Sequence, residues 1–208
     1  GLGARLLWNK IRVPYLLEIH HIPGYPKAAD FKERLYRLAT HFFIKHDTSK
    51  VKAIRVVNQR QVPEFLIKAG VPEKKLVLIP SFYIDLEIFH PMDVAKKYDL
   101  VFAARLEKNK GIYSLLEALK IAKKQKSDIK LLIIGSGPLK ENLKFEIENL
   151  KLHNNVVLAG WLLTAIDVAQ ALNSAKVFIN PSFNEGGPRV VLEAMACGLP
   201  TITTKVGA

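Results

Sequence analysis

Cysteine is almost absent from this sequence, and long apolar runs are missing altogether. The 208 residues contain one cysteine, Cys197, which excludes an internal disulfide and fits a reducing compartment. Because Cys197 follows an apolar helical pattern, we expect a small buried side chain and not a nucleophile. No apolar run approaches the roughly 20 residues of a membrane span. Low-complexity tracts, coiled-coil heptads and short-period repeats are also missing.

Signals for targeting and for nucleic-acid binding are equally scarce. No signal peptide is visible, and since the chain starts at Gly1 without a methionine, we expect its natural start to lie further upstream. The net charge of +12 is uneven: residues 1–98 hold 17 Lys/Arg against 9 Asp/Glu, and residues 99–208 hold 14 against 10. Such an excess attracts nucleic acid, anionic lipid or a phosphorylated substrate. No nucleic-acid-binding motif accompanies it, so charge alone does not choose between these partners.

What the chain does have is the composition of a soluble globular protein, 49% apolar and 24% charged, at a length that suits one large or two small domains. Patterns typical of strands and helices alternate along it. Strands are predicted at residues 13–19, 53–57, 76–79, 100–104, 130–134, 156–159, 177–179 and 201–203. Helices are predicted at residues 30–46, 58–70, 112–124, 139–150, 166–173 and 188–197. This alternation predicts an α/β fold of parallel sheets with right-handed crossovers.

One predicted helix, residues 30–46, is both apolar and basic. We expect its apolar residues to pack on the core and its basic residues to face solvent, with contact to an anionic membrane as the alternative. The apolar positions are Phe31, Leu35, Leu38, Phe42 and Phe43, and the basic ones are Lys32, Arg34 and Arg37.

The most informative stretch is residues 177–206, which predicts a strand, a glycine turn, a helix and a second strand. Glu185 precedes the pair Gly186-Gly187, and Glu193 follows eight residues later within an otherwise apolar helix. A bare backbone at a helix N-terminus suits a phosphate, whereas the natural partners of the two acids are hydroxyl groups. The alternative is that both are ordinary glutamates of a doubly wound sheet, since such a spacing is common by chance.

The segment Glu185–Glu193 closely resembles the E-x7-E signature of the retaining glycosyltransferases of family four. That family has the GT-B fold, in which two Rossmann-like parallel-sheet domains face a common cleft. The resemblance implies that Glu185 binds hydroxyls of the transferred sugar and Glu193 the ribose hydroxyls. It also implies that the amides around Gly186 and Gly187 contact the diphosphate.

The segment 105–111, which follows the strand at residues 100–104, resembles the G-R-L-x-x-x-K-G segment of the same family. The resemblance implies that Arg105 and Lys110 hold the donor diphosphate, and guanidinium and ammonium groups suit phosphate oxygens. Ala104 departs from the family, which usually has glycine there. The alternative is two solvated cations in a chain with 31 of them.

Four further residues are candidates. Gly135 begins a turn that resembles the family's G-x-G-P, which we interpret mainly as a tight turn beside the donor cleft. Trp161 and Leu162 lie where the family's backbone meets the nucleotide base; stacking of Trp161 on the base and partial burial under the sheet edge are both open. His20 matches a histidine that faces the reacting sugar in the family, and a structural histidine at a strand end is the alternative.

The resemblance spans residues 13–208 and implies the middle of a longer transferase, with both domains incomplete. We assign residues 1–90 to the acceptor-side Rossmann-like domain, residues 91–98 to a linker and residues 99–208 to the donor domain. The expected partners are a nucleoside-diphosphate sugar such as a UDP- or GDP-sugar, a glycan or lipid-linked acceptor, and an anionic membrane that the protein contacts peripherally. No nucleic acid is expected as a partner.

The predicted function is that of a retaining glycosyltransferase of cell-surface glycan or glycolipid synthesis, located in the cytoplasm or at the inner membrane face. No cofactor and no metal are expected, and no Asp-x-Asp motif occurs in the sequence. A sugar-nucleotide epimerase or a phosphorylase of the same fold stays open, although no pyridoxal-binding lysine region is identified. A non-catalytic module that binds anions or nucleic acid is the other alternative.

Overall fold

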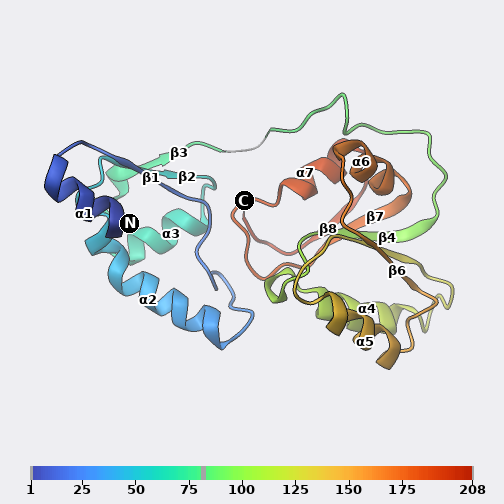
Figure 1. Ribbon diagram of the computed structural model, residues 1–208. Helices are drawn as coiled ribbons and strands as arrows, with labels where there is room; N and C mark the ends of the chain where they lie inside the picture. Colours follow the sequence, from blue (N-terminus) through green and yellow to red (C-terminus); the bar gives the residue numbers. More distant parts are fainter. Residues whose placement is uncertain (1, 81–82, 208) are drawn as a thin grey trace. The chain divides into compact units, whose positions relative to one another are not determined.

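The computed structural model describes residues 2–80 and 83–207, which form two compact units (Figure 1). The first unit comprises residues 1–82, 183–187 and 205–208, and the second comprises residues 83–182 and 188–204. The predicted linker, residues 91–98, therefore lies within the second unit. The separate roles assigned to the two domains stay a prediction.

The first unit contains a parallel sheet of three strands in the order β1-β2-β3. The strands are β1 (Leu16–Ile19), β2 (Ala53–Val56) and β3 (Leu76–Leu78), all at predicted positions. Ile54 of β2 lies opposite Leu17 of β1 and Leu76 of β3, and it is fully buried. The buried core around it is apolar and comprises Ile22, Val51, Ile54, Val56, Val62, Phe65, Leu66, Ala69 and Val71.

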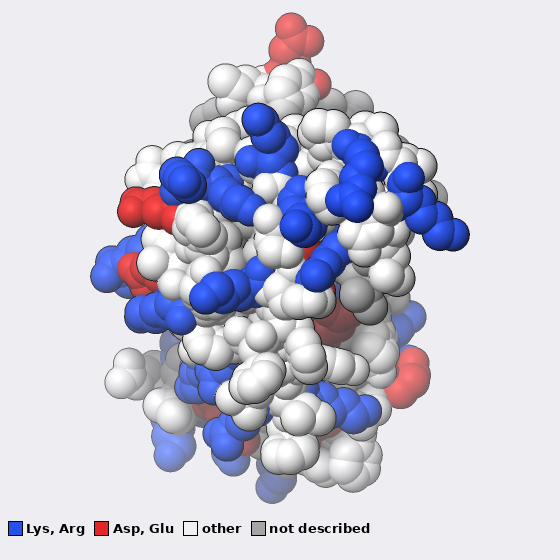
Figure 2. Space-filling view, turned by 90° about the vertical axis from the view of Figure 1, so that its left-hand side faces the viewer, with Lys and Arg blue, Asp and Glu red and all other residues white. Residues whose placement is uncertain are grey.

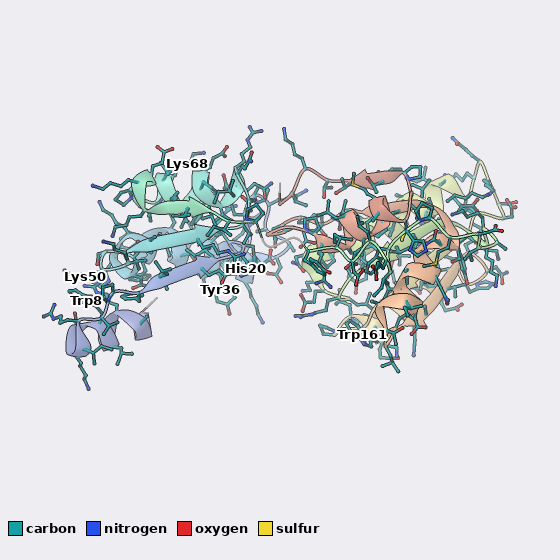
Figure 3. All side chains as sticks on the ribbon, turned by 90° about the horizontal axis from the view of Figure 1, so that it is seen from above. Trp8, His20, Tyr36, Lys50, Lys68 and Trp161 are labelled. Carbon is teal, nitrogen blue, oxygen red and sulfur yellow. The ribbon has the colours of Figure 1, made fainter. Side chains whose placement is uncertain are left out.

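The helices of the first unit are α1 (Leu2–Ile11), α2 (Phe31–Asp47) and α3 (Gln61–Lys68), with a short 3₁₀ helix at Glu73–Lys75. Asp30 is the N-cap of α2, since its side chain accepts a hydrogen bond from the Glu33 amide. The side chain of Asn58 accepts a hydrogen bond from the Val62 amide at the start of α3, whose N-cap position is Arg60. Helix α1 was not predicted. Its Trp8 ring lies beside Arg12 and Lys50, whose cations are 4.4 and 5.1 Å from the ring centroid (Figure 3).

Helix α2 forms where it was predicted, but its predicted packing is wrong. No residue of α2, which the structure describes throughout, is buried. Phe31 and Phe42 are 78% and 81% exposed, and Leu35 and Leu38 of the same stripe are also exposed. Instead, the face that carries Ile44 packs on the core of the first unit. Periodicity located the apolar stripe correctly but could not tell which face meets the rest of the unit.

The second unit contains a parallel sheet of five strands in the order β6-β5-β4-β7-β8. These are β4 (Tyr98–Ala103), β5 (Leu131–Ile134), β6 (Val156–Gly160), β7 (Ala175–Asn180) and β8 (Thr201–Thr203). The helices are α4 (Ile112–Ala122), α5 (Lys140–Asn149), α6 (Ala165–Asn173) and α7 (Arg189–Ala196), with a 3₁₀ helix at Lys108–Lys110. Helices α4 and α5 cover one face of the sheet, and α6 and α7 cover the other (Figure 1).

Alternation along β4 divides this unit into two apolar layers. Val101 and Ala103 belong to the core under α6 and α7, whereas Phe102 points into the core under α4 and α5. Both faces of the sheet are thus covered, as expected for strands that follow one another through helical crossovers. Cys197 is 3% exposed within the first of these cores, and burial raises the pKa of its thiol, so the prediction of a small buried residue is confirmed.

A partly buried charge, Asp99, lies near the start of the central strand. The Asp99 carboxylate accepts hydrogen bonds from Lys126 Nζ at 2.6 Å, Lys176 Nζ at 2.9 Å and the Lys130 amide at 3.0 Å. Burial alone would raise the pKa of Asp99, but these hydrogen bonds outweigh it and hold that pKa far below its ordinary value. The carboxylate therefore joins β4 to the starts of β5 and β7.

Asp99→Asn is expected to lower the free energy of unfolding by about 2 kcal/mol at pH 7, because it removes hydrogen bonds to a charged group. Since the folded-state pKa of Asp99 is lowered, its stabilisation is complete above an unfolded pKa of about 4 and declines as the pH falls below it. Urea unfolding followed by circular dichroism should show a smaller difference from wild type at pH 3 than at pH 7.

The control for this prediction is Glu141→Gln, since the Glu141 side chain is 75% exposed and pairs with Lys144 on the helix surface. We expect a change below about 0.5 kcal/mol for this exposed pair. Equal losses in the two variants would show that Asp99 is an ordinary surface charge.

Candidate functional site

The order of strands in the second unit reverses at β4. The chain runs from β4 outward to β5 and β6, then returns to the other side of β4 for β7 and β8. In open parallel sheets, ligands bind outside the carboxyl ends of the strands where this order reverses. Gly111, at φ +69°, begins α4 at this edge, and a Cβ on it would overlap the Pro181 carbonyl oxygen after β7. Only glycine allows the two backbones to approach so closely.

A pocket of about 340 Å³ opens at this edge of the sheet, between the ends of β4, β5 and β6 and the helices α6 and α7. It brings together several of the predicted site residues, which are distant in the sequence. These are Arg105, Gly135, Trp161, Leu162 and Glu193. Leu163 and Thr164, which the sequence analysis did not single out, also line it.

Glu193 is the buried charge of this pocket. Its residue is 7% exposed, and its Oε1 accepts a hydrogen bond from Arg189 Nε at 2.9 Å, one helical turn earlier on α7. A buried carboxylate requires a compensating cation or donors, and Arg189 supplies a cation while most of its own side chain stays in solvent. Sequence reasoning missed Arg189, although the i, i+4 spacing of opposite charges within α7 was a usable signal.

Arg105 lies directly after the central strand and lines the same pocket. Its side chain is 71% exposed, and its Nη1 lies 3.2 Å from Glu107 Oε1. Such an exposed pair is worth little in stability, so the guanidinium can exchange this partner for another anion at small cost. Lys110 ends the 3₁₀ helix just before Gly111 and is not among the residues that line the pocket.

The glycines of the turn at Gly135 are required by a close backbone contact that could not be seen in the sequence. At Gly135, with φ +133°, a Cβ would overlap the Ala104 carbonyl oxygen, and at Gly137 it would lie 2.6 Å from the Leu106 carbonyl oxygen. The loop after β5 therefore lies directly on the loop after β4. This contact fixes the floor of the pocket next to Arg105.

Trp161 is 69% exposed, so the sheet edge covers only a minor part of it, and its stacking on a base stays a prediction. Figure 3 shows it at the surface of the second unit, and its residue lines the pocket. An exposed aromatic ring at the edge of a pocket offers a face for stacking.

The other predicted site residues, His20, Glu185, Gly186 and Gly187, belong to the first unit. His20 follows β1, and its Nε2 lies 2.8 Å from Glu18 Oε1, a carboxylate that also pairs with Arg55. Contact between this histidine and a sugar stays a prediction. Among residues 2–80 and 83–207, no three His, Cys, Asp or Glu side chains gather where they could hold a metal ion.

Residues 86–208 match the family model of glycosyl transferases group 1, which covers more than half of the sequence and the whole pocket described above. The chain belongs to this family. It is 32% identical to the D-inositol 3-phosphate glycosyltransferase of Pseudarthrobacter chlorophenolicus over 131 residues, which are 62% of this chain and 31% of that protein.

A second relative aligns with almost the whole chain. It is the uncharacterized glycosyltransferase MJ1059 of Methanocaldococcus jannaschii, 29% identical over 218 residues, which cover 96% of this chain and 51% of the relative. The chain thus spans about a third to a half of the length of these curated relatives.

Solved structures resemble the chain in fold. Anabaena HepE in complex with UDP and glucose has a TM-score of 0.77 at 19% identity, over 99% of this chain and 57% of that one. The pneumococcal O-GlcNAc transferase GtfA in complex with UDP and GlcNAc has a TM-score of 0.74 at 24% identity, over 98% of this chain and 40% of that one. With the two parallel sheets, these likenesses confirm the predicted GT-B fold. Membership of family four within this larger group stays a prediction.

Gly135→Ala is expected to lower the free energy of unfolding by about 3 kcal/mol, because the new Cβ combines backbone strain with overlap of the Ala104 carbonyl. Gly160→Ala is the matched control, since Gly160 has φ +73° but a Cβ added there would have no neighbour within 4 Å. It should cost only the strain of a left-handed residue, about 1–2 kcal/mol. Urea unfolding compares the two, and equal losses would contradict the close contact at Gly135.

Proposed function

We propose that this chain is the central part of a retaining glycosyltransferase that moves a sugar from a nucleoside-diphosphate sugar to an acceptor hydroxyl. The observation that carries the proposal is the buried, arginine-held carboxylate of Glu193 in a pocket at the carboxyl edge of a parallel sheet. A carboxylate has acceptor sites for two neighbouring hydroxyl groups, as a ribose presents them. Family membership and two relatives of similar fold in complex with UDP support a nucleotide as the ligand.

In this proposal, different residues of the pocket bind different parts of the nucleotide-sugar donor. Glu193 binds the ribose hydroxyls, and Trp161 offers its exposed ring to the base. Arg105 lies after the central strand, where its guanidinium can leave Glu107 to hold the diphosphate. Lys110 adds a second cation from the following turn.

The chemical step that we propose is loss of the nucleoside diphosphate from the anomeric carbon. As that bond breaks, negative charge grows on the diphosphate, and fixed cations such as Arg105 and Lys110 stabilise it. Glu185 binds hydroxyls of the transferred sugar. The acceptor hydroxyl attacks from the face that the diphosphate leaves and gives its proton to the departing diphosphate oxygen, so the anomeric configuration is retained. The resemblance of residues 185–193 to the E-x7-E signature supports these roles.

Glu193→Gln is expected to weaken the binding of a nucleoside diphosphate by about 10- to 100-fold, because charge-assisted hydrogen bonds to ribose are lost. Glu185→Gln should leave that affinity within about twofold and lower the turnover number by about 100-fold, since its partner is the sugar. Calorimetry with UDP and GDP and transfer assays with their sugars, both on the intact protein, measure the two effects.

Two results would contradict the assignments. Unchanged nucleotide affinity in Glu193→Gln would make Glu193 a structural residue, and turnover near that of wild type in Glu185→Gln would remove its contact with the sugar. Product analysis also separates the alternatives, because an epimerase changes the donor sugar without an acceptor.

We further propose that the acceptor is lipid-linked or otherwise anionic and that the first unit meets it at the cytoplasmic face of a membrane. Residues 2–80 carry 15 Lys/Arg against 6 Asp/Glu, and Figure 2 shows Lys and Arg spread over this side of the molecule with few acidic side chains. On α2, the basic residues Lys32 and Arg34 accompany the exposed rings of Phe31 and Phe42. Apolar and basic groups together on one helix suit an anionic bilayer surface. Within residues 2–80 and 83–207, no helix has the length and hydropathy of a membrane span.

Phe31→Ser with Phe42→Ser is expected to weaken co-sedimentation with anionic vesicles by at least about tenfold, because two apolar side chains no longer enter the bilayer. Lys32→Glu with Arg34→Glu should weaken it similarly, and added salt should weaken binding of the wild type. Phe145→Ser is the control, since Phe145 is 69% exposed on α5 of the second unit and should not matter.

Equal binding of the wild type to neutral and anionic vesicles would contradict the membrane proposal. So would a large loss of stability in the intact protein on replacement of Phe42, because that would mean that other protein covers the ring.

A further inference from the structure

The turn that carries Glu185 is packed with the first unit although its neighbours in sequence are not. Residues 183–187 cluster with the first unit, whereas Ser182 and Pro188 on either side belong to the second. The contacts that hold this turn to residues 20–62 therefore decide where the Glu185 backbone lies within the first unit. They include hydrogen bonds from two buried asparagines, a close backbone approach at one glycine, and the Lys27 cation 5.1 Å from the centre of the Phe183 ring.

Asn184, immediately before Glu185, is 1% exposed. Its Nδ2 donates to the Lys27 carbonyl at 3.1 Å and to Glu33 Oε2 at 3.0 Å. The same Glu33 oxygen accepts a hydrogen bond from the Ala29 amide at 2.8 Å, so the turn is fastened to the loop that leads into α2. A buried amide with both donors used is costly to replace, because its partners would lose their hydrogen bonds.

Asn58 holds the other side of Glu185. It is 3% exposed, its Nδ2 donates to the Gly186 carbonyl at 2.9 Å, and its Oδ1 accepts from the Val62 amide at 3.1 Å. One side chain thus joins the turn to the first residues of α3. The residue pair 58 and 186 is separated by 128 positions, so this contact exists only in the folded chain.

Gly186 allows the turn to come this close. A Cβ at this position would overlap the backbone carbonyl oxygen of His20 and lie 3.4 Å from the His21 Cβ. The turn therefore lies on the backbone that follows β1, next to the residue predicted to face the sugar. A larger residue at position 186 would push the turn away from that backbone.

We propose that Asn58 and Asn184 are positioning residues for Glu185. By fixing the backbone on both sides of it, they hold its carboxylate ready for the transferred sugar, so that binding energy is not spent on ordering the turn. This inference rests on the proposed function, in which Glu185 contacts the sugar. A purely structural role for the two asparagines predicts instead a loss of stability without a specific change at residues 183–187.

The test uses Asn58→Asp and Asn184→Ala in the intact protein. Asn58→Asp keeps an acceptor for the Val62 amide but removes the donor to the Gly186 carbonyl, so it separates the helix cap from the turn contact. The matched control is Asn155→Ala, because Asn155 is 2% exposed in the second unit and donates to the Ser127 and Ile129 carbonyls, away from the turn.

Hydrogen exchange read by mass spectrometry is expected to be at least about tenfold faster at residues 183–187 in both variants, and unchanged there in the control. The turnover number with a nucleotide sugar should fall about 10- to 100-fold, while affinity for the nucleoside diphosphate stays within about twofold. If Asn184→Ala fails to fold, Asn58→Asp alone provides both measurements.

Each of the following four results would overturn the inference. Unchanged exchange at residues 183–187 would show that the asparagines do not hold the turn, and faster exchange with full turnover would show that holding it does not matter. A wild-type protein that transfers no sugar would overturn the proposed function and this inference with it. An active wild type with unaffected variants would overturn only the role of the asparagines.

Discussion

Close contact between backbones at the carboxyl end of β4 is the constraint on which the second unit depends. The loops after β4, β5 and β7 meet there through Gly111 and Gly135, where any Cβ would overlap a carbonyl oxygen. Parallel strands direct all their carboxyl ends to this edge, so one crowded region has to hold several loops at once. Because glycine has no Cβ, the loops can approach closely there, and the pocket lined by Arg105 and Glu193 lies beside them.

In the pocket and in the turn at residues 183–187, a glutamate or the backbone beside it is held in place by hydrogen bonds, but by different groups. Glu193 is buried on α7 and is held by the Arg189 cation one helical turn away. Glu185 lies on a turn that neutral side-chain amides hold on both sides of it. The Asn58 amide donates to the Gly186 carbonyl, and the Asn184 amide donates to Glu33. In both cases hydrogen bonds within the chain orient the backbone or the carboxylate, which in the proposed function lowers the entropic cost of binding.

How much of this the sequence predicted depends on the range of the interactions involved. Strands such as β5, with four consecutive apolar residues, and helices such as α4 were found close to their observed limits, because periodicity and turn residues are local properties. Helix α1 was not predicted, because residues 2–11 contain no capping residue and no glycine at the helix end to mark its limits. On α2 the stripe was found but assigned to the core, since periodicity does not say what lies against a helix face.

The sequence by itself determined the alternation of parallel strands and helices, the glycine turns at the sheet edge and the candidate residues after each strand. Only the tertiary structure decided that Arg105, Gly135, Trp161 and Glu193 line one pocket and that Arg189 neutralises its buried acid. It alone decided that Asn58 reaches Gly186, since no local pattern encodes a hydrogen bond across 128 positions. The physical reason is that such contacts depend on how the sheets bring distant loops together, and that arrangement exists only once the core has formed.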